Sequence, residues 1–297
     1  MKQDLTVSVC MITYNHEKFI TQAIISVLEQ ECEFEIELIL MDDYSTDSTS
    51  EVINSLLENH PKSSRVKYIR HEKNIGVIPN FIQALKKCNG KYIALCDGDD
   101  YWIDPLKLQK QVNFLNSNNN YIACFHNAKI INQKKEEINY HEWSSNKDIN
   151  HEDIIMNGGG IFPTAALVYR NVLNSDSFLL NTKSGDSILA FSLVGLGQFY
   201  FFKEFMCVYR KHDEGVYTSL SFYPEKRLED IISNIYLLSN FRKTSKIKLR
   251  KYYNKAIRKQ LQRISNSFGL RFILSLTLRN EIQIKDCFYY LLFKIIK

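Results

Sequence analysis

Glycine and proline are scarce in this chain, with 11 and 5 among its 297 residues, and the sequence contains neither a low-complexity segment nor an internal repeat. This composition excludes a disordered protein and domains joined by long flexible linkers. Hydrophobic residues make up 45% of the chain, which is enough to bury a substantial core. We therefore expect one large α/β domain, alone or with an appendage.

The seven cysteines are odd in number and form no C-x-x-C pair. Four of them (Cys10, Cys96, Cys124 and Cys207) lie in strand-like apolar runs, which favours buried free thiols in a reducing compartment. The N-terminus lacks a signal-peptide pattern, and no apolar stretch approaches the about 20 residues that cross a bilayer. We expect a cytoplasmic protein.

The net charge of +5 is unevenly distributed. From Glu225 onward the chain carries 17 Lys and Arg against 5 Asp and Glu, so the preceding part is acidic overall. A basic tail on an acidic body favours an anionic partner surface for the tail, either nucleic acid or anionic lipid. Together with a change to a helical pattern beyond Pro224, this predicts a domain of residues 1–222 and a basic helical extension of residues 223–297.

Strand-like and helix-like segments alternate regularly through the first half of the chain. The strands read as continuous apolar runs, which is typical of a parallel sheet covered by helices on both faces. Ligands of such sheets bind beyond the carboxyl ends of the strands. The expected strands are 6–13, 36–41, 66–70 and 92–96, and the expected helices are 17–30, 48–58 and 77–88.

The second half is less regular. It predicts helices at 106–115 and 186–194, strands at 121–125 and 129–131, and a hairpin made of 198–202 and 205–209. The polar stretch 133–153 is expected to be a loop or insertion. In the tail, Leu249, Tyr253, Ile257, Leu261 and Ile264 recur on one helical face.

Three polar clusters follow the predicted strands, and Asp97-Gly98-Asp99-Asp100 is the strongest of them. Three carboxylates within four residues repel one another unless a cation neutralises them, and oxygen ligands suit Mg²⁺ or Mn²⁺. Such an ion also binds phosphates, as a nucleoside diphosphate leaving group requires. The alternative is a solvated acidic turn.

The other two clusters are Thr13-Tyr14-Asn15-His16 and Asp42-Asp43-Tyr44-Ser45. In the functional interpretation, a carboxylate of the second cluster accepts a hydrogen bond from a nucleobase while Tyr14 stacks on its ring. The alternatives are an aspartate that caps the next helix, for which Asp47 is also suited, and simple packing of Tyr14.

Four motifs together resemble the family 2 glycosyltransferases of the GT-A fold, in both order and spacing. They are Val9-Cys10-Met11-Ile12-Thr13-Tyr14-Asn15, Asp42-Asp43-Tyr44-Ser45-Thr46-Asp47, Asn74-Ile75-Gly76 and Asp97-Gly98-Asp99-Asp100-Tyr101-Trp102. The resemblance covers roughly residues 6 to 215. It implies a Rossmann-like, mostly parallel sheet flanked by helices and an inverting transfer from a nucleoside-diphosphate sugar.

The resemblance also implies roles for individual residues. Those matching the family's sugar-nucleotide contacts are Thr13, Tyr14, Asn15, Asp43, Asn74, Asp97 and Asp99. Those matching its Mn²⁺ or Mg²⁺ site are Asp99, Asp100 and His212. Asp99 and Asp100 each fit the last position of the D-x-D motif. His212 follows Tyr209-Arg210-Lys211, as in the family, but a lone histidine is also a common surface residue.

An inverting displacement needs a base for the acceptor hydroxyl. By resemblance this is Asp186 in Gly185-Asp186, which lies 86 residues beyond Asp100 and opens a predicted helix. The alternative role of Asp186 is an N-cap, and Asp176 and Asp213 are competing bases. Phe162-Pro163-Thr164-Ala165 resembles a segment that contacts the acceptor.

The function expected from all of this is a metal-dependent transferase that builds a surface glycan, with a UDP-sugar as the favoured donor and a glycan or lipid-linked glycan as acceptor. The basic tail then suits peripheral contact with an anionic membrane on its inner face, or is a helical subdomain that packs on the catalytic body with a solvated basic face, and we expect no nucleic-acid partner. The alternative is a non-catalytic sugar-nucleotide-binding scaffold or partner subunit. A nucleotidyltransferase is disfavoured because no Gly-rich loop follows the first strand. The sequence leaves the oligomeric state open.

Overall fold

The computed structural model describes residues 5–132, 136–173, 184–212 and 224–268. Contacts divide the chain into two compact units. The first unit consists of Met1–Ile149, Gly160–Phe178 and Leu196–His212, and the second of Asn150–Gly159, Leu179–Gly195 and Asp213–Lys297. The expected boundary between residues 222 and 223 lies outside the described residues and stays a prediction.

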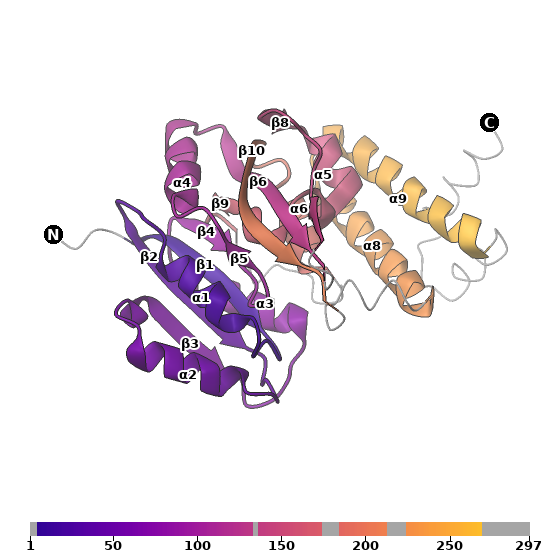
Figure 1. Cartoon of the computed structure of the whole chain (residues 1–297). Helices are drawn as coiled ribbons and strands as arrows, with labels where there is room; N and C mark the ends of the chain where they lie inside the picture. The colour runs from indigo at the N-terminus through magenta and orange to yellow at the C-terminus, as the bar shows by residue number, and fades with distance from the viewer. Residues whose placement is uncertain (1–4, 133–135, 174–183, 213–223, 269–297) are drawn as a thin grey trace, which may run out of the picture. The chain divides into compact units, whose positions relative to one another are not determined.

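The first unit is built on a mixed sheet with the strand order β3-β2-β1-β4-β9-β6-β10-β5 (Figure 1). Its first four strands are parallel to one another, as the alternating pattern predicts. They are β1 (Leu5–Thr13), β2 (Glu35–Asp42), β3 (Val66–Arg70) and β4 (Tyr92–Leu95). The helices between them are α1 (Ile20–Leu28), α2 (Thr49–Asn59) and α3 (Val77–Lys87).

The other half of the sheet mixes both directions. β6 (Tyr121–Ile131) and β10 (Gln198–Arg210) are parallel to each other, whereas β9 (Val168–Arg170) runs antiparallel between β4 and β6. β5 (Tyr101–Trp102) and β8 (Lys147–Ile149) pair with β10, and β7 (Glu137–Asn139) pairs with β6. α4 (Lys107–Ser117) precedes β6, and 3₁₀ turns occur at Ser63–Arg65, Gly158–Ile161 and Thr164–Ala166.

The apolar residues 38–41 of β2 and the whole of β4 lie in the core, where every residue of β4 is buried. α1 covers the sheet with an apolar face made of Ile20, Ala23, Ile24, Val27 and Leu28, all fully buried. The prediction of a mostly parallel α/β sheet flanked by helices is therefore confirmed for this chain. Helical coverage of this kind is what allows parallel strands to be apolar on both faces.

Three details of the second half differ from expectation. The predicted hairpin at 198–209 is wrong, because these residues form the single strand β10, whose register shifts between Phe202 and Phe205. The two short strands expected at 121–125 and 129–131 are one strand, β6. The polar stretch 133–153 is not simply a loop, since it contains β7 and β8.

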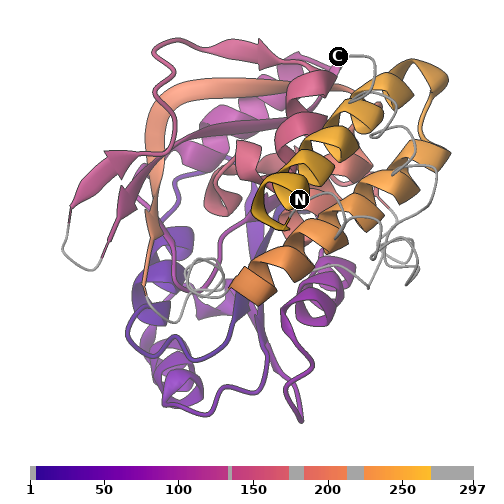
Figure 2. The same ribbon diagram turned by 90° about the vertical axis from the view of Figure 1, so that its right-hand side faces the viewer.

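The second unit is helical where it is described. It contains α5 (His151–Asn157), α6 (Gly185–Leu193), α8 (Pro224–Thr244) and α9 (Ile247–Phe268). α8 and α9 lie side by side in both views (Figures 1 and 2). The predicted apolar face of α9 is confirmed, because Leu249, Tyr253, Ile257, Leu261 and Ile264 are all buried. Among the described residues, every helix is too short or too polar to cross a membrane.

Candidate functional site

The carboxyl ends of β1, β2 and β4 meet at one edge of the sheet. There the Asp43 N–H donates to the carbonyl of Thr13 at 3.0 Å, and the Gly98 N–H donates to the carbonyl of Ile12 at 2.9 Å. These two bonds join the ends of three strands directly. The polar clusters predicted from the sequence therefore belong to one site in the first unit.

Two residues at this edge have a left-handed backbone, Asn15 with φ 56° and Tyr44 with φ 62°. Asn15 tolerates that conformation and its amide group locks the two loops together, since Oδ1 accepts from the Thr46 N–H at 2.8 Å. Tyr44 is a bulky residue for which positive φ is costly, and such strain concentrates at functional sites. Tyr14 and Tyr44 expose 42% and 41% of their surface, and the Arg70 guanidinium lies 4.9 Å from the centre of the Tyr44 ring, so Tyr14 is the better candidate for stacking on a base.

The two aspartates at the end of β2 hold different loops. Asp42 is fully buried and accepts from the N–H and hydroxyl of Ser45. Asp43 accepts from the backbone N–H groups of Ile75 and Gly76 at 2.7 and 2.8 Å. Asp43 thereby positions the loop that carries Asn74, whose side chain is exposed. Each carboxylate oxygen has a second lone pair, so this arrangement leaves acceptor capacity for a nucleobase.

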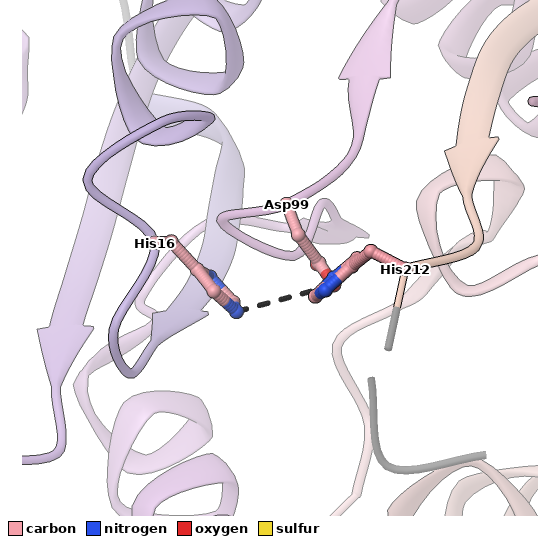
Figure 3. A group of neighbouring side chains, drawn as sticks. All are labelled: His16, Asp99 and His212. Carbon is pink, nitrogen blue, oxygen red and sulfur yellow. Dashed lines mark hydrogen bonds and ion pairs between the residues drawn. The ribbon is translucent and has the colours of Figure 1, made fainter. Parts of the chain in front are cut away.

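The best-defined cluster of ligand-type groups consists of His16, Asp99 and His212, which converge from three separate segments (Figure 3). The Nε2 atom of His212 lies 3.0 Å from Oδ2 of Asp99, and the Nε2 atom of His16 lies 3.9 Å from the same oxygen. Burial raises the pKa of Asp99, but the His212 hydrogen bond and both imidazoles outweigh it and lower that pKa overall. Asp99 is thus held as a carboxylate.

A second group of potential ligands overlaps the first. One carboxylate oxygen each from Asp97, Asp99 and Asp100 lies within 4.8 Å of the others. Asp100 is buried and accepts from the Arg210 N–H at 2.9 Å. Burial raises the pKa of Asp100 well above its usual range, and the neighbouring carboxylates Asp99 and Asp97 add to that effect. A buried carboxyl group beside two others is the arrangement that a bound cation relieves.

These donor sets fit a divalent cation. Asp99 belongs to both groups, and carboxylate and imidazole ligands suit first-row ions such as Mn²⁺, while carboxylates alone also suit Mg²⁺. The predicted ligands Asp99, Asp100 and His212 therefore lie at one place, with Asp97 beside them. Which of Asp99 and Asp100 would be the main ligand stays a prediction, but only Asp99 joins the carboxylates to the histidines.

Arg210 supports this arrangement from the end of β10. Its guanidinium donates to the carbonyl of Asp99 at 2.6 Å and lies 4.3 Å from the centre of the Tyr101 ring. It also donates to the side-chain oxygen of Gln22. Arg210 had no predicted role beyond the Tyr-Arg pattern, and His16 had no predicted role. The only sequence signal for His16 was its position at the end of the first polar cluster.

Asp186, the predicted base, belongs to the second unit and lies in the first turn of α6. The N-cap of α6 is Ser184, whose hydroxyl accepts from the Ser187 N–H, so Asp186 is not the capping residue. A Cβ added at Gly159 would come within 2.2 Å of the Asp186 Cβ, so a glycine is needed for this close approach. The competing candidates Asp176 and Asp213 lie outside the described residues.

The sequence matches the profile described as glycosyl transferase family 2 over residues 8–176. A *Mycobacterium tuberculosis* relative described as an uncharacterized protein is 33% identical over 74% of this chain, and the chain spans only 62% of that relative's length. An *Escherichia coli* relative, the UDP-Glc:α-D-GlcNAc-diphosphoundecaprenol β-1,3-glucosyltransferase WfaP, is 36% identical over 37% of this chain and 41% of its own.

The similarity to solved structures covers more of this chain than the similarity in sequence does. *Staphylococcus aureus* TarS 1–349 in complex with UDP-GlcNAc aligns with a TM-score of 0.62 at 19% identity, over 87% of this chain and 81% of TarS 1–349. The mannosyltransferase PcManGT from *Pyrobaculum calidifontis*, in complex with GDP-Man and Mn²⁺, aligns with a TM-score of 0.60 at 15% identity, over 98% and 86%. Because the family profile matches more than half of the residues, this chain belongs to glycosyl transferase family 2.

Proposed function

We propose that the chain transfers a sugar, with inversion, from a nucleoside-diphosphate sugar to an acceptor hydroxyl, and that the reaction depends on Mn²⁺ or Mg²⁺. The observation that carries this proposal is the position of Asp99, shared by a carboxylate group and a histidine group at the edge where three parallel strands end. Sugar nucleotides bind at this edge of such sheets. A divalent ion supplies Lewis-acid stabilisation of the leaving diphosphate when it is bound.

The nucleotide half of the donor is assigned to the loops after β1 and β2. In this proposal Tyr14 stacks on the base, Asp43 accepts from a base N–H, and Thr13, Asn15 and Asn74 complete the pocket. Both loops are fixed by their own hydrogen bonds, Asn15 to Thr46 and Asp43 to Gly76. Such preorganisation reduces the conformational entropy lost on binding. A UDP-sugar is the favoured donor, since TarS is described with UDP-GlcNAc and WfaP is named for UDP-Glc.

The chemical step assigned to Asp186 is removal of the acceptor proton. The acceptor oxygen attacks the anomeric carbon as the bond to the diphosphate oxygen breaks, the proton passes to the Asp186 carboxylate, and the diphosphate leaves with the bonding electron pair. The carboxylate is suited to this role because Ser184 caps α6 in its place. The close packing of Gly159 keeps the first turn of the helix in position.

We assign the acceptor to a surface glycan or its lipid-linked precursor, on the support of the basic helix α9 and of the lipid-linked substrate in the name of WfaP. α9 contains no acidic residue and exposes Lys248, Lys251, Lys255, Lys259 and Arg263, of which Lys255 is paired with Glu152. Each cation near an anionic membrane surface contributes about 1 kcal/mol. Peripheral contact of this face with the inner face of a membrane would bring the enzyme to a lipid-linked acceptor.

The test of membrane contact is flotation with vesicles of phosphatidylcholine, with and without phosphatidylglycerol. We expect binding only to the anionic vesicles, weakening with salt. A Lys251→Gln/Lys259→Gln/Arg263→Gln variant should bind at least tenfold more weakly, because about 1 kcal/mol is lost per cation. Equal binding to both kinds of vesicle, or no binding, would rule out this role of α9.

The test of donor binding is calorimetric titration of UDP, GDP, CDP and dTDP into the full chain, with Mn²⁺, with Mg²⁺ and without either ion. We expect metal-dependent binding of one nucleotide, followed by transfer or slow hydrolysis of the matching sugar nucleotide. An absence of binding for every nucleotide, with either metal and without metal, would refute the proposed function.

A further inference from the structure

Resting on the function proposed above, we infer that His16 is a third protein ligand of the divalent ion, beside Asp99 and His212. The site would then offer two imidazole nitrogens and one carboxylate to the ion. Neither the D-x-D pattern nor the histidine after β10 assigns His16, which lies in the loop after β1. The consequence is a preference for Mn²⁺ over Mg²⁺.

The geometry supports binding of one ion by all three side chains. The two Nε2 atoms lie 3.0 and 3.9 Å from the same Asp99 oxygen, and all three donor atoms lie within 4.8 Å of one another. Ligand bonds of about 2.1 Å place donors on one octahedral ion about 3.0 Å apart when adjacent and about 4.2 Å apart when opposite. The observed distances therefore need shifts of less than about 1 Å. In Figure 3 both rings point toward Asp99.

The Thr13 hydroxyl is placed to favour the tautomer of His16 that this role requires. Its Nδ1 lies 3.2 Å from the Thr13 hydroxyl, which can accept the Nδ1–H bond. A proton on Nδ1 leaves the lone pair of Nε2 directed at Asp99. Metal-binding histidines usually have their second nitrogen fixed in this way. Thr13 is thus a positioning residue in addition to its place near the donor.

The His16 ring is held on several sides. The His16 N–H donates to the Thr49 hydroxyl at 2.8 Å, which anchors the backbone. Phe19 packs at its edge with ring centres 6.5 Å apart, and the same Phe19 lies 5.0 Å from the His212 ring. A Cβ on Gly98 would come within 2.9 Å of His16 Nδ1, so the glycine allows the acidic loop to reach the ring. A preorganised ring of this kind is expected of a ligand rather than a surface histidine.

The chemistry of the ligands sets the metal preference. Mg²⁺ prefers oxygen ligands and retains its waters, whereas imidazole nitrogen favours first-row transition ions. A site with three carboxylates alone would discriminate weakly between Mg²⁺ and Mn²⁺. Adding two imidazoles shifts the site toward Mn²⁺, and removing His16 should reduce that preference.

The experiment uses the full chain with MnCl₂ alone and follows Mn²⁺ by electron paramagnetic resonance. The concentration of unbound Mn²⁺, read from its signal, gives the affinity of the chain for Mn²⁺. Competition by MgCl₂ gives the preference for Mn²⁺ over Mg²⁺. Electron spin-echo modulation detects imidazole nitrogen bound to Mn²⁺. The variants are His16→Asn and His212→Asn, with His60→Asn as matched control. His60 lies outside the cluster and pairs with Glu29.

We expect nitrogen couplings from two imidazoles in the wild type and the His60 variant, and from one in each of the other variants. The preference for Mn²⁺ over Mg²⁺ should fall about tenfold in His16→Asn. Thr13→Val, which retains the ring but removes its hydroxyl partner, should weaken Mn²⁺ binding by a smaller factor. Unchanged nitrogen couplings and an unchanged metal preference in His16→Asn would overturn the inference.

That failure is distinguishable from failure of the proposed function. If the wild type binds a nucleotide with metal but His16→Asn behaves like the His60 variant, only the role of His16 is wrong. If no nucleotide binds with either metal, the proposed function itself is wrong. Far-ultraviolet circular dichroism of each variant verifies that a lost signal does not come from unfolding.

Discussion

His212 and Asp99 are hydrogen-bonded at 3.0 Å although 113 residues separate them in the chain. The contact joins the end of β10 to the loop after β4. These two strands are not neighbours in the sheet, because β9 and β6 lie between them. Arg210 reinforces it, because its backbone donates to Asp100 and its guanidinium to the carbonyl of Asp99. The acidic loop therefore has a fixed shape before any ion arrives, which favours tight and selective binding.

Replacing Asp99 by Asn should abolish metal-dependent nucleotide binding, because Asp99 belongs to both groups of ligands. We expect a loss of at least about 100-fold in kcat, comparable with removal of a major electrostatic contribution to a transition state. Asp97 belongs only to the group of three carboxylates, so Asp97→Asn should lower kcat by a smaller factor. Calorimetry and a donor-hydrolysis assay measure both effects.

The control for these variants is Asp148→Asn, whose carboxylate accepts from the Tyr121 hydroxyl away from the cluster. It should bind nucleotide like the wild type. If Asp99→Asn retained metal-dependent binding, the metal would have to be held without Asp99, and the interpretation of both groups would be wrong.

Replacing Gly98 by Ala should destabilise the fold and weaken Mn²⁺ binding. The new Cβ would come within 2.8 Å of the Thr13 hydroxyl and 2.9 Å of His16 Nδ1, closer than van der Waals contact allows. Overpacking of this kind costs about 1–3 kcal/mol. Urea unfolding measures the loss. Gly160→Ala is the matched control, since nothing lies within 4 Å of its added Cβ, and equal stability of the two variants would contradict this explanation.

The first half of the fold could be predicted because its signals are local. β4 is apolar throughout, β2 contains the apolar run 38–41, and α1 has a single apolar face, so element type and order follow from periodicity. The convergence of the three polar clusters also followed, because the ends of parallel strands meet at one edge. Local pattern failed in β10, where Lys203 and Glu204 resemble a turn but lie within the strand at its register shift.

The contribution of His16 could not be predicted from the sequence. Its ring is near Asp99 only because β1 and β4 are adjacent and because Gly98 lets the two loops approach. Neither fact is visible in a short motif. Similarly, the cap of α6 could not be decided, since Ser184 and Asp186 are both good N-cap residues and the structure places Ser184 there.

Replacing Asp186 by Asn should stop transfer while leaving donor binding unchanged, because the carboxylate is proposed to act on the acceptor proton alone. We expect kcat to fall by about 100-fold or more, within the usual range for a general base. Comparing nucleotide affinity with transfer rate separates the two steps. Asp153→Asn, in the first turn of α5, is the control, and an active Asp186→Asn would exclude Asp186 as the base.

Replacing Lys107 by Met should stabilise the fold at pH 7. Lys107 is fully buried, its Nζ has no hydrogen-bond partner among the described residues, and it lies 4.1 Å from the centre of the Trp102 ring. Burial lowers the pKa of Lys107 from 10.5 to about 8. At about 1.4 kcal/mol per pKa unit, the charged form is penalised in the folded state by about 3 kcal/mol.

The pH dependence of this penalty has a definite sign. Between pH 8 and 10.5 the unfolded chain binds a proton at Lys107 that the folded chain has released, so the free energy of unfolding rises with pH in that interval. Lys107→Met lacks this contribution. The excess of its free energy of unfolding over that of the wild type should therefore be largest at pH 7 and smaller at pH 9.5. Urea unfolding at the two pH values measures the change. For Lys110→Met, which removes an exposed ion pair with Asp104, the difference in free energy of unfolding from the wild type should be the same at the two pH values. A Lys107→Met protein less stable than the wild type at both pH values would mean that the buried ammonium group is compensated within the core.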